Sequence, residues 1–350
     1  MSDNSTAWLD NLESHLNANP MAWLLEDDVK NPGVRYFALR DLLDLAPDDP
    51  QVTLAQKRIM ENGPVPVILS HQKADGTWEK DKGIYNPKYF STVWQVQMLA
   101  QLGADGNDQR IKKSGELLLS KYRCRYGAIT NTPNSNVLIQ CLQGGLCSAL
   151  IDLGWLGDKR LDEALDWLAR SVSGEGIAPA ENKEAVIRYY RSGNSGPGFL
   201  CSANLHKPCA WGAIKTMLAL SKIPLDVRTP NIKRAIDLGW EFLLGVDPLT
   251  ADYPTFEDRK PSQSWFRFGY PLFYVTDLLQ NLEVLTRLGF GKDSRLKNAV
   301  DYLLTKQDEQ ARWKMTYTYN GKTWVDIEEK NEPSKWVTLR VMRVFKGAFS

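Results

Sequence analysis

A short phrase recurs along this chain, and a repeat constrains the fold more than any single segment does. Each clear copy places an Asp a few residues after a Leu-Gly pair, and these copies begin at Leu102, Leu153 and Leu288; a weaker copy without the pair begins at Pro224. A glycine can end a helix in the left-handed conformation, and an Asp can accept hydrogen bonds from the first turn of the next helix. The repeating unit is therefore predicted to be a helix, a short turn and a second helix.

The two helices of each predicted pair differ in their surroundings. Those that enter the turns are apolar or small on most sides, which is typical of helices buried between layers. They are expected at residues 89–102, 137–153, 208–220 and 272–288. Those that leave the turns place apolar residues at helical spacing between charges, as at Leu161, Leu165 and Leu168, and are expected to expose one face. Two less regular pairs near the ends bring the prediction to five or six pairs of an inner and an outer helix.

The predicted fold class is all-α, with a small amount of strand. Alternation over 313–325 around Asn320-Gly321 predicts a small hairpin near the C-terminus. No shift in composition marks a linker, so we expect one domain over 1–350, with N-terminal helices in 1–62 and the repeats in 63–350.

Composition and charge exclude several classes of function. The chain has 43 Lys and Arg against 42 Asp and Glu, so no global positive field exists and no nucleic-acid partner is expected. Its apolar runs are too short for an integral membrane segment, and its polar start does not resemble a secretory signal. Five scattered cysteines suit reduced thiols. These features predict a cytoplasmic protein, and a protein partner stays open.

A second motif stands at turns that follow outer helices. Residues 72–78 read Gln-Lys-Ala-Asp-Gly-Thr-Trp, and 307–313 form a degenerate copy. Such a Gln can bond carbonyls at a helix end while the Trp packs across the turn. The motif resembles the Gln-Trp repeat of the squalene cyclase and protein prenyltransferase superfamily, and the phrases at 269–274, 306–309 and 324–329 resemble a bacterial group within it.

The resemblance implies an alpha/alpha toroid, in which inner helices surround a central cavity and outer helices surround them. It also implies a prenyltransferase-like or terpene cyclase-like protein that acts on or binds an isoprenoid or another hydrophobic small molecule. The acidic hallmarks of such cyclases, D-x-D-D and D-D-x-x-D, do not occur in the sequence, and neither does the D-x-C pair of zinc prenyltransferases. The resemblance therefore supports the architecture more strongly than the activity.

Cysteine and histidine residues form a candidate zinc site instead. Cys201, His206 and Cys209 lie near the start of one predicted inner helix, and Cys141 lies near the start of an earlier one. Cys and His are suitable zinc ligands, and in a toroid the beginnings of inner helices line one rim of the cavity. The alternative is that these cysteines are small buried hydrophobic residues, because their spacing is not a standard zinc pattern.

Aromatic residues also concentrate near the predicted starts of inner helices. The resemblance implies that they line the cavity, since rings in related cyclases stabilise carbocations through their negative faces. The cavity candidates are Tyr89, Trp94, Trp211, Trp265, Phe268, Tyr274 and Trp336. The alternative is that these rings simply fill the barrel.

Two carboxylates are candidates for catalysis. Asp277 stands in an apolar helix, where burial could raise its pKa, and the alternative is a local cap or pair. Asp326 is predicted to join Lys335 and Arg267 in a polar cluster at the rim, with ordinary surface pairing as the alternative. Two functions thus stay open: an enzyme with a non-standard acid or metal site, and a non-catalytic toroid scaffold that binds a hydrophobic ligand or a protein partner.

Overall fold

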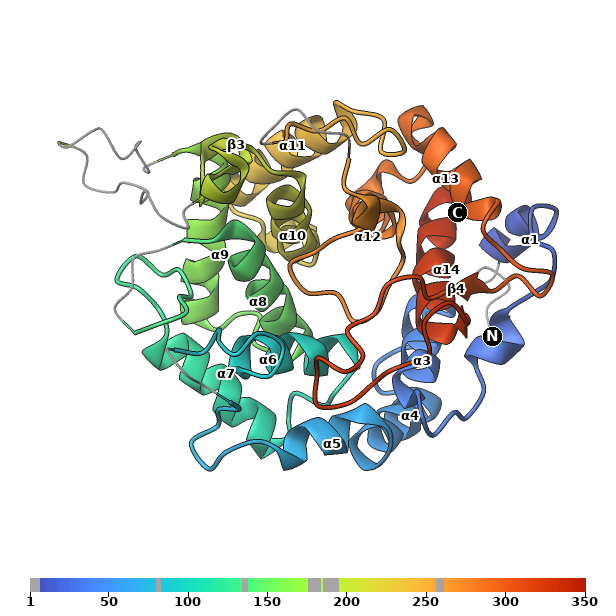
Figure 1. Cartoon of the computed structure of the whole chain (residues 1–350), viewed down its shortest axis with the longest axis horizontal. Helices are drawn as coiled ribbons and strands as arrows, with labels where there is room; N and C mark the ends of the chain where they lie inside the picture. The colour runs from blue at the N-terminus through green and yellow to red at the C-terminus, as the bar shows by residue number, and fades with distance from the viewer. Residues whose placement is uncertain (1–6, 80–82, 134–137, 176–183, 185–194, 256–260) are drawn as a thin grey trace.

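The computed structural model describes residues 7–79, 83–133, 138–175, 184, 195–255 and 261–350. Its helices form an inner and an outer layer around a common centre (Figure 1). The inner layer contains α3 (Pro32–Phe37) with η1 (Ala38–Leu42), α6 (Thr92–Gln101), α8 (Gln140–Asp152), α10 (Ala210–Ser221), α12 (Leu278–Leu285) and α14 (Lys335–Phe349). The outer layer contains α4 (Pro50–Glu61), α5 (Pro64–Ser70), α7 (Gln109–Lys121), α9 (Lys159–Ser173), α11 (Pro230–Leu244) and α13 (Lys297–Leu304). The predicted alpha/alpha toroid is confirmed.

Shorter elements connect or flank these layers. The short α1 (Ala7–Glu13) and α2 (Met21–Leu24) contact α14. Short helical turns lie in the connections: η2 (Pro197–Phe199), η3 (Ser202–Asn204), η4 (Leu225–Val227), η5 (Gln263–Phe266), η6 (Thr286–Phe290) and η7 (Ser294–Leu296). No helix in the described part of the chain combines the length and the apolar composition that crossing a bilayer requires.

The N-terminal helices close the ring. Successive inner helices contact one another from α6 through α8, α10 and α12 to α14, and α14 then contacts α3 and η1. At this closure Arg343 on α14 donates to Asp41 on η1 over 2.7 Å, and the rings of Phe37 and Trp336 lie 6.2 Å apart. Sequence alone does not show whether the first helix pair completes the ring or packs against its side, because these contacts join opposite ends of the chain.

The turns of the repeat behave as predicted. Gly103 and Gly154 follow inner helices with φ of 81° and 85°, the left-handed region that glycine adopts without strain. Asp108 and Asp158 each accept a hydrogen bond from the backbone amide two residues later, at 2.8 Å, and thus cap the outer helices α7 and α9. Local signals therefore define where each helix pair turns.

The two Gln-Trp segments make equivalent contacts. The indole of Trp78 donates to the carbonyl of Ile68 at 2.7 Å, and that of Trp313 donates to the carbonyl of Leu303 at 2.8 Å. Both tryptophans are fully buried. Gln72 donates to a carbonyl at the start of α7 at 2.9 Å, so this side chain ties one outer helix to the next.

All four inner helices with predicted ranges begin later than predicted, α8 at Gln140 rather than at 137 and α10 at Ala210 rather than at 208. Helix α6 begins at Thr92 rather than at residue 89, because Tyr89 has a φ of 67° and cannot continue a right-handed helix. Helix α12 begins at Leu278 rather than at 272, because Asp277 is in an extended conformation and caps it.

The predicted hairpin around Asn320-Gly321 is wrong in its pairing. Strand β4 (Trp313–Lys314) pairs antiparallel with β5 (Pro333–Ser334), just before α14. The intervening residues form a loop that side chains hold together, since Asn320 donates to the carbonyl of Glu328 at 2.8 Å. A second small antiparallel sheet, which the sequence did not predict, contains β1 (Ser195–Gly196), β2 (Leu200–Cys201) and β3 (Lys207–Pro208).

Candidate functional site

Four of the seven predicted cavity aromatics pack together near the N-terminal ends of the inner helices. The ring centroid of Trp94 lies 5.3 Å from that of Tyr89 and 6.0 Å from that of Tyr274, and Tyr274 lies 6.3 Å from Trp211. Phe273 adds a further ring 5.4 Å from Trp94. Trp94 and Phe273 are buried by these contacts. The rings thus contact each other at this end of the toroid, as the packing alternative describes.

The other three aromatics lie elsewhere. Trp336 stacks on Tyr270 with 4.1 Å between ring centroids, and Trp265 donates to the carbonyl of Pro248 at 2.9 Å. Phe268 is buried as well, and its backbone bonds the segment that follows β4. The seven rings therefore do not form one common lining.

The four predicted zinc ligands come near one another without forming a metal site. Cys209 donates a hydrogen bond to Cys201, and Cys141 interacts electrostatically with both. His206 is exposed in the turn between β2 and β3, with a φ of 60°. Across the described residues, no three His, Cys, Asp or Glu side chains are placed to hold a metal ion. The strand pairing of residues 200–208 leaves the histidine exposed in the turn, from where it acts on Cys201 only electrostatically.

The thiols of this cluster differ in acidity. The hydrogen bond from Cys209 lowers the pKa of Cys201 to about 6, although burial acts in the opposite direction. The same contact raises the pKa of Cys209, and burial raises the pKa of Cys141 to about 11. At neutral pH the cluster therefore holds its thiolate on Cys201.

Asp326 does not belong to the predicted rim cluster. It is exposed and accepts a hydrogen bond from a backbone amide of its own loop at 2.7 Å. Lys335 instead pairs with Glu26 at 2.8 Å and with Asp28 at 3.0 Å, and Arg267 donates to a nearby glutamine. The prediction of a polar cluster of Asp326, Lys335 and Arg267 is wrong. Residues 26–28, which precede α3, pack against the start of α14 and form the ion pairs of Lys335.

Asp277 lies in a buried ion-pair network centred on Arg340. Asp277 caps α12 by accepting from the amide of Gln280 at 2.7 Å, and its two oxygens accept from Arg340 at 2.9 and 3.0 Å. Arg340 also donates twice to Glu283, at 2.8 and 2.9 Å, and once to the carbonyl of Gly269 at 2.9 Å. These bonds use all five N–H groups of a guanidinium. Asp277 is thus a helix cap and an ion-pair partner, which is the local alternative to catalysis.

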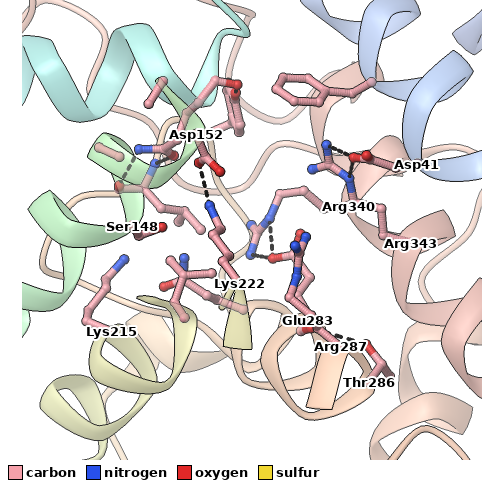
Figure 2. A pocket seen from close by; sticks show the side chains of 18 of the residues that line it. Asp41, Ser148, Asp152, Lys215, Lys222, Glu283, Thr286, Arg287, Arg340 and Arg343 are labelled. Atoms are coloured by element: carbon pink, nitrogen blue, oxygen red, sulfur yellow. Dashed lines mark hydrogen bonds and ion pairs between the residues drawn. The ribbon is translucent and has the colours of Figure 1, made fainter. Parts of the chain in front are cut away.

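A cavity of about 400 Å³ lies where the C-terminal halves of the inner helices converge (Figure 2). All six inner segments contribute to its lining. Six cationic side chains and three carboxylates line it: Lys215, Lys222, Arg287, Arg340, Arg343 and Lys346, with Asp41, Asp152 and Glu283. Apolar side chains, among them Phe37, Leu218 and Leu272, complete the wall. The wall of the cavity therefore combines charged and apolar side chains, and the predicted aromatic residues do not line it.

Most charges in this cavity have a partner within the protein. Lys222 forms an ion pair with Asp152, and Arg343 forms one with Asp41 (Figure 2). Lys346 forms an ion pair with Asp44, which lies just outside the lining. Paired in this way, these groups hold the helix ends together and largely cancel each other's charge.

Lys215 and Arg287 are the exceptions. Within the part of the chain that the structure describes, neither side chain forms a hydrogen bond or an ion pair. Arg287 is exposed at the mouth of the cavity, whereas Lys215 is only 2% exposed. Burial lowers the pKa of Lys215 to about 7; Asp277 acts against this, and Arg340 acts with it. At neutral pH a large fraction of this amine is therefore uncharged.

Two glycines on α8 bring Lys215 into place. A Cβ atom at Gly144 would overlap the backbone carbonyl of Lys215, and one at Gly145 would overlap the side chain of Gln97 on α6. Because both positions lack a side chain, α8 packs closely against its two neighbours in the inner layer. The backbone of α10 thus lies against α8 and directs the lysine toward the cavity.

Sequence reasoning missed this site. The available signal was one lysine inside the otherwise apolar helix 210–221, a pattern that normally indicates a side chain reaching the surface. Only the arrangement of six helices shows that Lys215 ends in an internal cavity.

The ring of helices and its charged cavity define an α/α toroid protein with a cavity of small-molecule size. The sequence matches no family model and no curated protein. Among solved structures, the chain is similar to an unsaturated glucuronyl hydrolase specific for heparin, with 12% identity over 91% of this chain and 85% of that chain and a TM-score of 0.47. It is also similar to the type II terpene cyclase MstE from Scytonema, with 13% identity over 81% of this chain and 95% of that chain and a TM-score of 0.30. At these identities and TM-scores the comparisons do not bear on activity, which is argued below from the residues themselves.

Proposed function

We propose that this chain binds a small molecule with an anionic group, a phosphate or a carboxylate, in the charged cavity. The observation that carries the proposal is that two basic side chains, Lys215 and Arg287, have no partner among the described residues, in a cavity whose other charges are paired. A bound anion would give both side chains the charge-assisted hydrogen bonds that the fold does not supply.

The size and the apolar wall of the cavity support a ligand with a short hydrocarbon part. A volume of about 400 Å³ lies near the lower end of the roughly 300–1,000 Å³ typical of small-molecule sites. Phe37, Leu218 and Leu272 offer apolar surface beside the cations. An isoprenyl diphosphate has both an anionic group and a hydrocarbon part. The predicted isoprenoid ligand would therefore suit this cavity as its diphosphate.

Isothermal titration calorimetry with three probes tests the proposal. Inorganic diphosphate and geranyl diphosphate should bind, and raising the salt concentration should weaken both, whereas uncharged geraniol should bind far more weakly. Arg287→Gln removes a cation at the mouth and should weaken diphosphate binding by ~10-fold, which corresponds to about 1.4 kcal/mol. Arg295→Gln is the matched control, because it removes an exposed arginine that pairs with Asp293 outside the cavity.

The three probes also separate the alternatives. Tighter binding of geranyl diphosphate than of inorganic diphosphate would support the isoprenoid ligand, and equal binding would favour a purely polar one. Binding of geraniol as tightly as geranyl diphosphate, or binding of neither anion, would refute the anion site. Binding of neither anion is the result expected of a toroid scaffold that binds a protein partner.

A further inference from the structure

Among the residues that the structure describes, none forms an ion pair with the amine of Lys215. The carboxylates nearest to it in the network, Asp277 and Glu283, both accept two hydrogen bonds from Arg340. Arg340 in turn has no free N–H group with which to hold a ligand. Lys215 is thus a buried amine whose side chain lines a cavity and whose potential partners are already occupied.

Lys215 differs in its contacts from Lys222, the residue that directly follows the same helix. Burial lowers the pKa of Lys222 as well, but its ion pair with Asp152 opposes this shift and favours the charged, non-nucleophilic form. Lys215 has no such partner among the described residues, and desolvation favours its neutral form. Enzymes that use lysine as a nucleophile toward carbonyl groups activate it by this kind of desolvation.

We propose that Lys215 forms a covalent imine with the carbonyl group of an anionic ligand, an oxo acid or a phosphorylated aldehyde, bound in the charged cavity. This inference rests on the proposed function, because Arg287 would hold the anionic group while the carbonyl carbon meets the amine. The amine nitrogen attacks the carbonyl carbon, a C–N bond forms and the C–O bond breaks. The oxygen leaves as water with the two protons that the amine gives up, so the step needs no oxidant, reductant or cofactor.

The charged groups around Lys215 set the pH at which it reacts. Asp277 at the start of α12 and Glu283 within α12 favour the ammonium form, Arg340 on α14 opposes it, and Cys141 on α8 faces the same amine. Burial outweighs these interactions and brings the pKa to about 7. Imine formation at Lys215 should therefore rise through pH 7 and level off, whereas solvated lysines continue to gain reactivity up to about pH 10.

Reductive trapping on the intact protein tests this inference. The protein is treated at pH 7 with glyoxylate and sodium cyanoborohydride, and peptide mass spectrometry follows the carboxymethyl group that reduction leaves on each lysine. Lys215 should be modified at least ~10-fold faster than Lys57, whose side chain is 70% exposed, because burial keeps the Lys215 amine largely neutral at this pH. Glycolaldehyde, which replaces the carboxylate by a hydroxymethyl group, is the matched neutral probe and should modify Lys215 more slowly than glyoxylate does.

Two variants support the measurement. Lys215→Met keeps a long unbranched side chain without an amine and should leave Lys222 and the surface lysines modified at unchanged rates. If this variant fails to fold, the peptide map of the wild type is sufficient to test the imine, because it compares the modification rates of different lysines within one molecule. Arg287→Gln should slow trapping by glyoxylate and leave trapping by glycolaldehyde unchanged.

The outcomes separate the imine from the anion site. If Lys215 is modified no faster than the surface lysines while inorganic diphosphate still binds, the imine is refuted and the anion site stands. If Lys215 is modified equally fast by both aldehydes and no anion binds, the nucleophilic lysine stands without the proposed anion site. Uniform slow modification with no anion binding refutes both.

Discussion

Replacing Lys215 by methionine should stabilise the protein at pH 6, and the gain should disappear as the pH rises. Burial moves the pKa of this amine from the ordinary value of 10.5 to about 7. At 1.36 kcal/mol for each pH unit, that change corresponds to at most about 5 kcal/mol of unfavourable free energy in the folded state. Methionine of similar length removes the charge and keeps the packing, so a gain of about 2–5 kcal/mol is expected.

The sign of the pH dependence follows from proton binding. Between pH 7 and 10.5 the unfolded chain keeps a proton on Lys215 and the folded protein does not, so the free energy of unfolding of the wild type rises with pH. Below pH 7 both states bind the proton, and the penalty is present in full. The methionine variant lacks this dependence, and its advantage over the wild type should therefore shrink from pH 7 toward pH 10.

Urea unfolding followed by circular dichroism at pH 6, 7.5 and 9 measures this difference after dialysis to remove bound anions. Taking the difference between variant and wild type cancels the titrating groups that do not interact with Lys215, including Cys201. Lys57→Met is the control, because the side chain of Lys57 is 70% exposed on α4. A wild type as stable as the methionine variant at pH 6, or a difference that stays constant up to pH 9, would show that the fold itself satisfies the ammonium group and would refute the reasoning.

Two further predictions concern the charges and thiols around the ring. Arg340→Gln leaves two carboxylates in the buried network without their counter-charge and should lower the free energy of unfolding by ~3–5 kcal/mol in the same urea assay; a loss below about 1 kcal/mol would contradict the network's structural role. Iodoacetamide at pH 7 should alkylate Cys201 before the other cysteines, with a rate that falls only as the pH drops through about 6. Cys209→Ala removes the hydrogen bond that favours the Cys201 thiolate, so alkylation at pH 7 should slow; peptide mass spectrometry that finds an unchanged rate would contradict that cause.

The helix pairs could be predicted because their signals act over a few residues. The left-handed glycine at 103 and the capping Asp108 both lie within the turn that they define. The same is true of Trp78, whose indole bonds a carbonyl ten residues earlier. Such interactions depend little on the rest of the fold, so their sequence pattern is sufficient to place them.

The candidate site could not be predicted in the same way. Arg340 is 63 residues from Asp277 in the chain, and Arg343 is 302 residues from Asp41, yet these pairs shape the cavity. Reasoning from residue type chose Asp277 and the cysteines and histidine near 201–209, since these groups are common in catalytic and metal sites. The structure gives Asp277 an arginine partner and leaves His206 in solvent.

The sequence by itself determined the repeating helix pairs, their order around a toroid and the motif that ties outer helices together. The tertiary structure alone decided that the first helices close the ring and that Lys215, a buried amine, lines the charged cavity. The physical reason is the range of the forces involved. A helix cap is a local hydrogen bond, whereas the pKa of a buried amine depends on the desolvation and charge supplied by every helix that surrounds it.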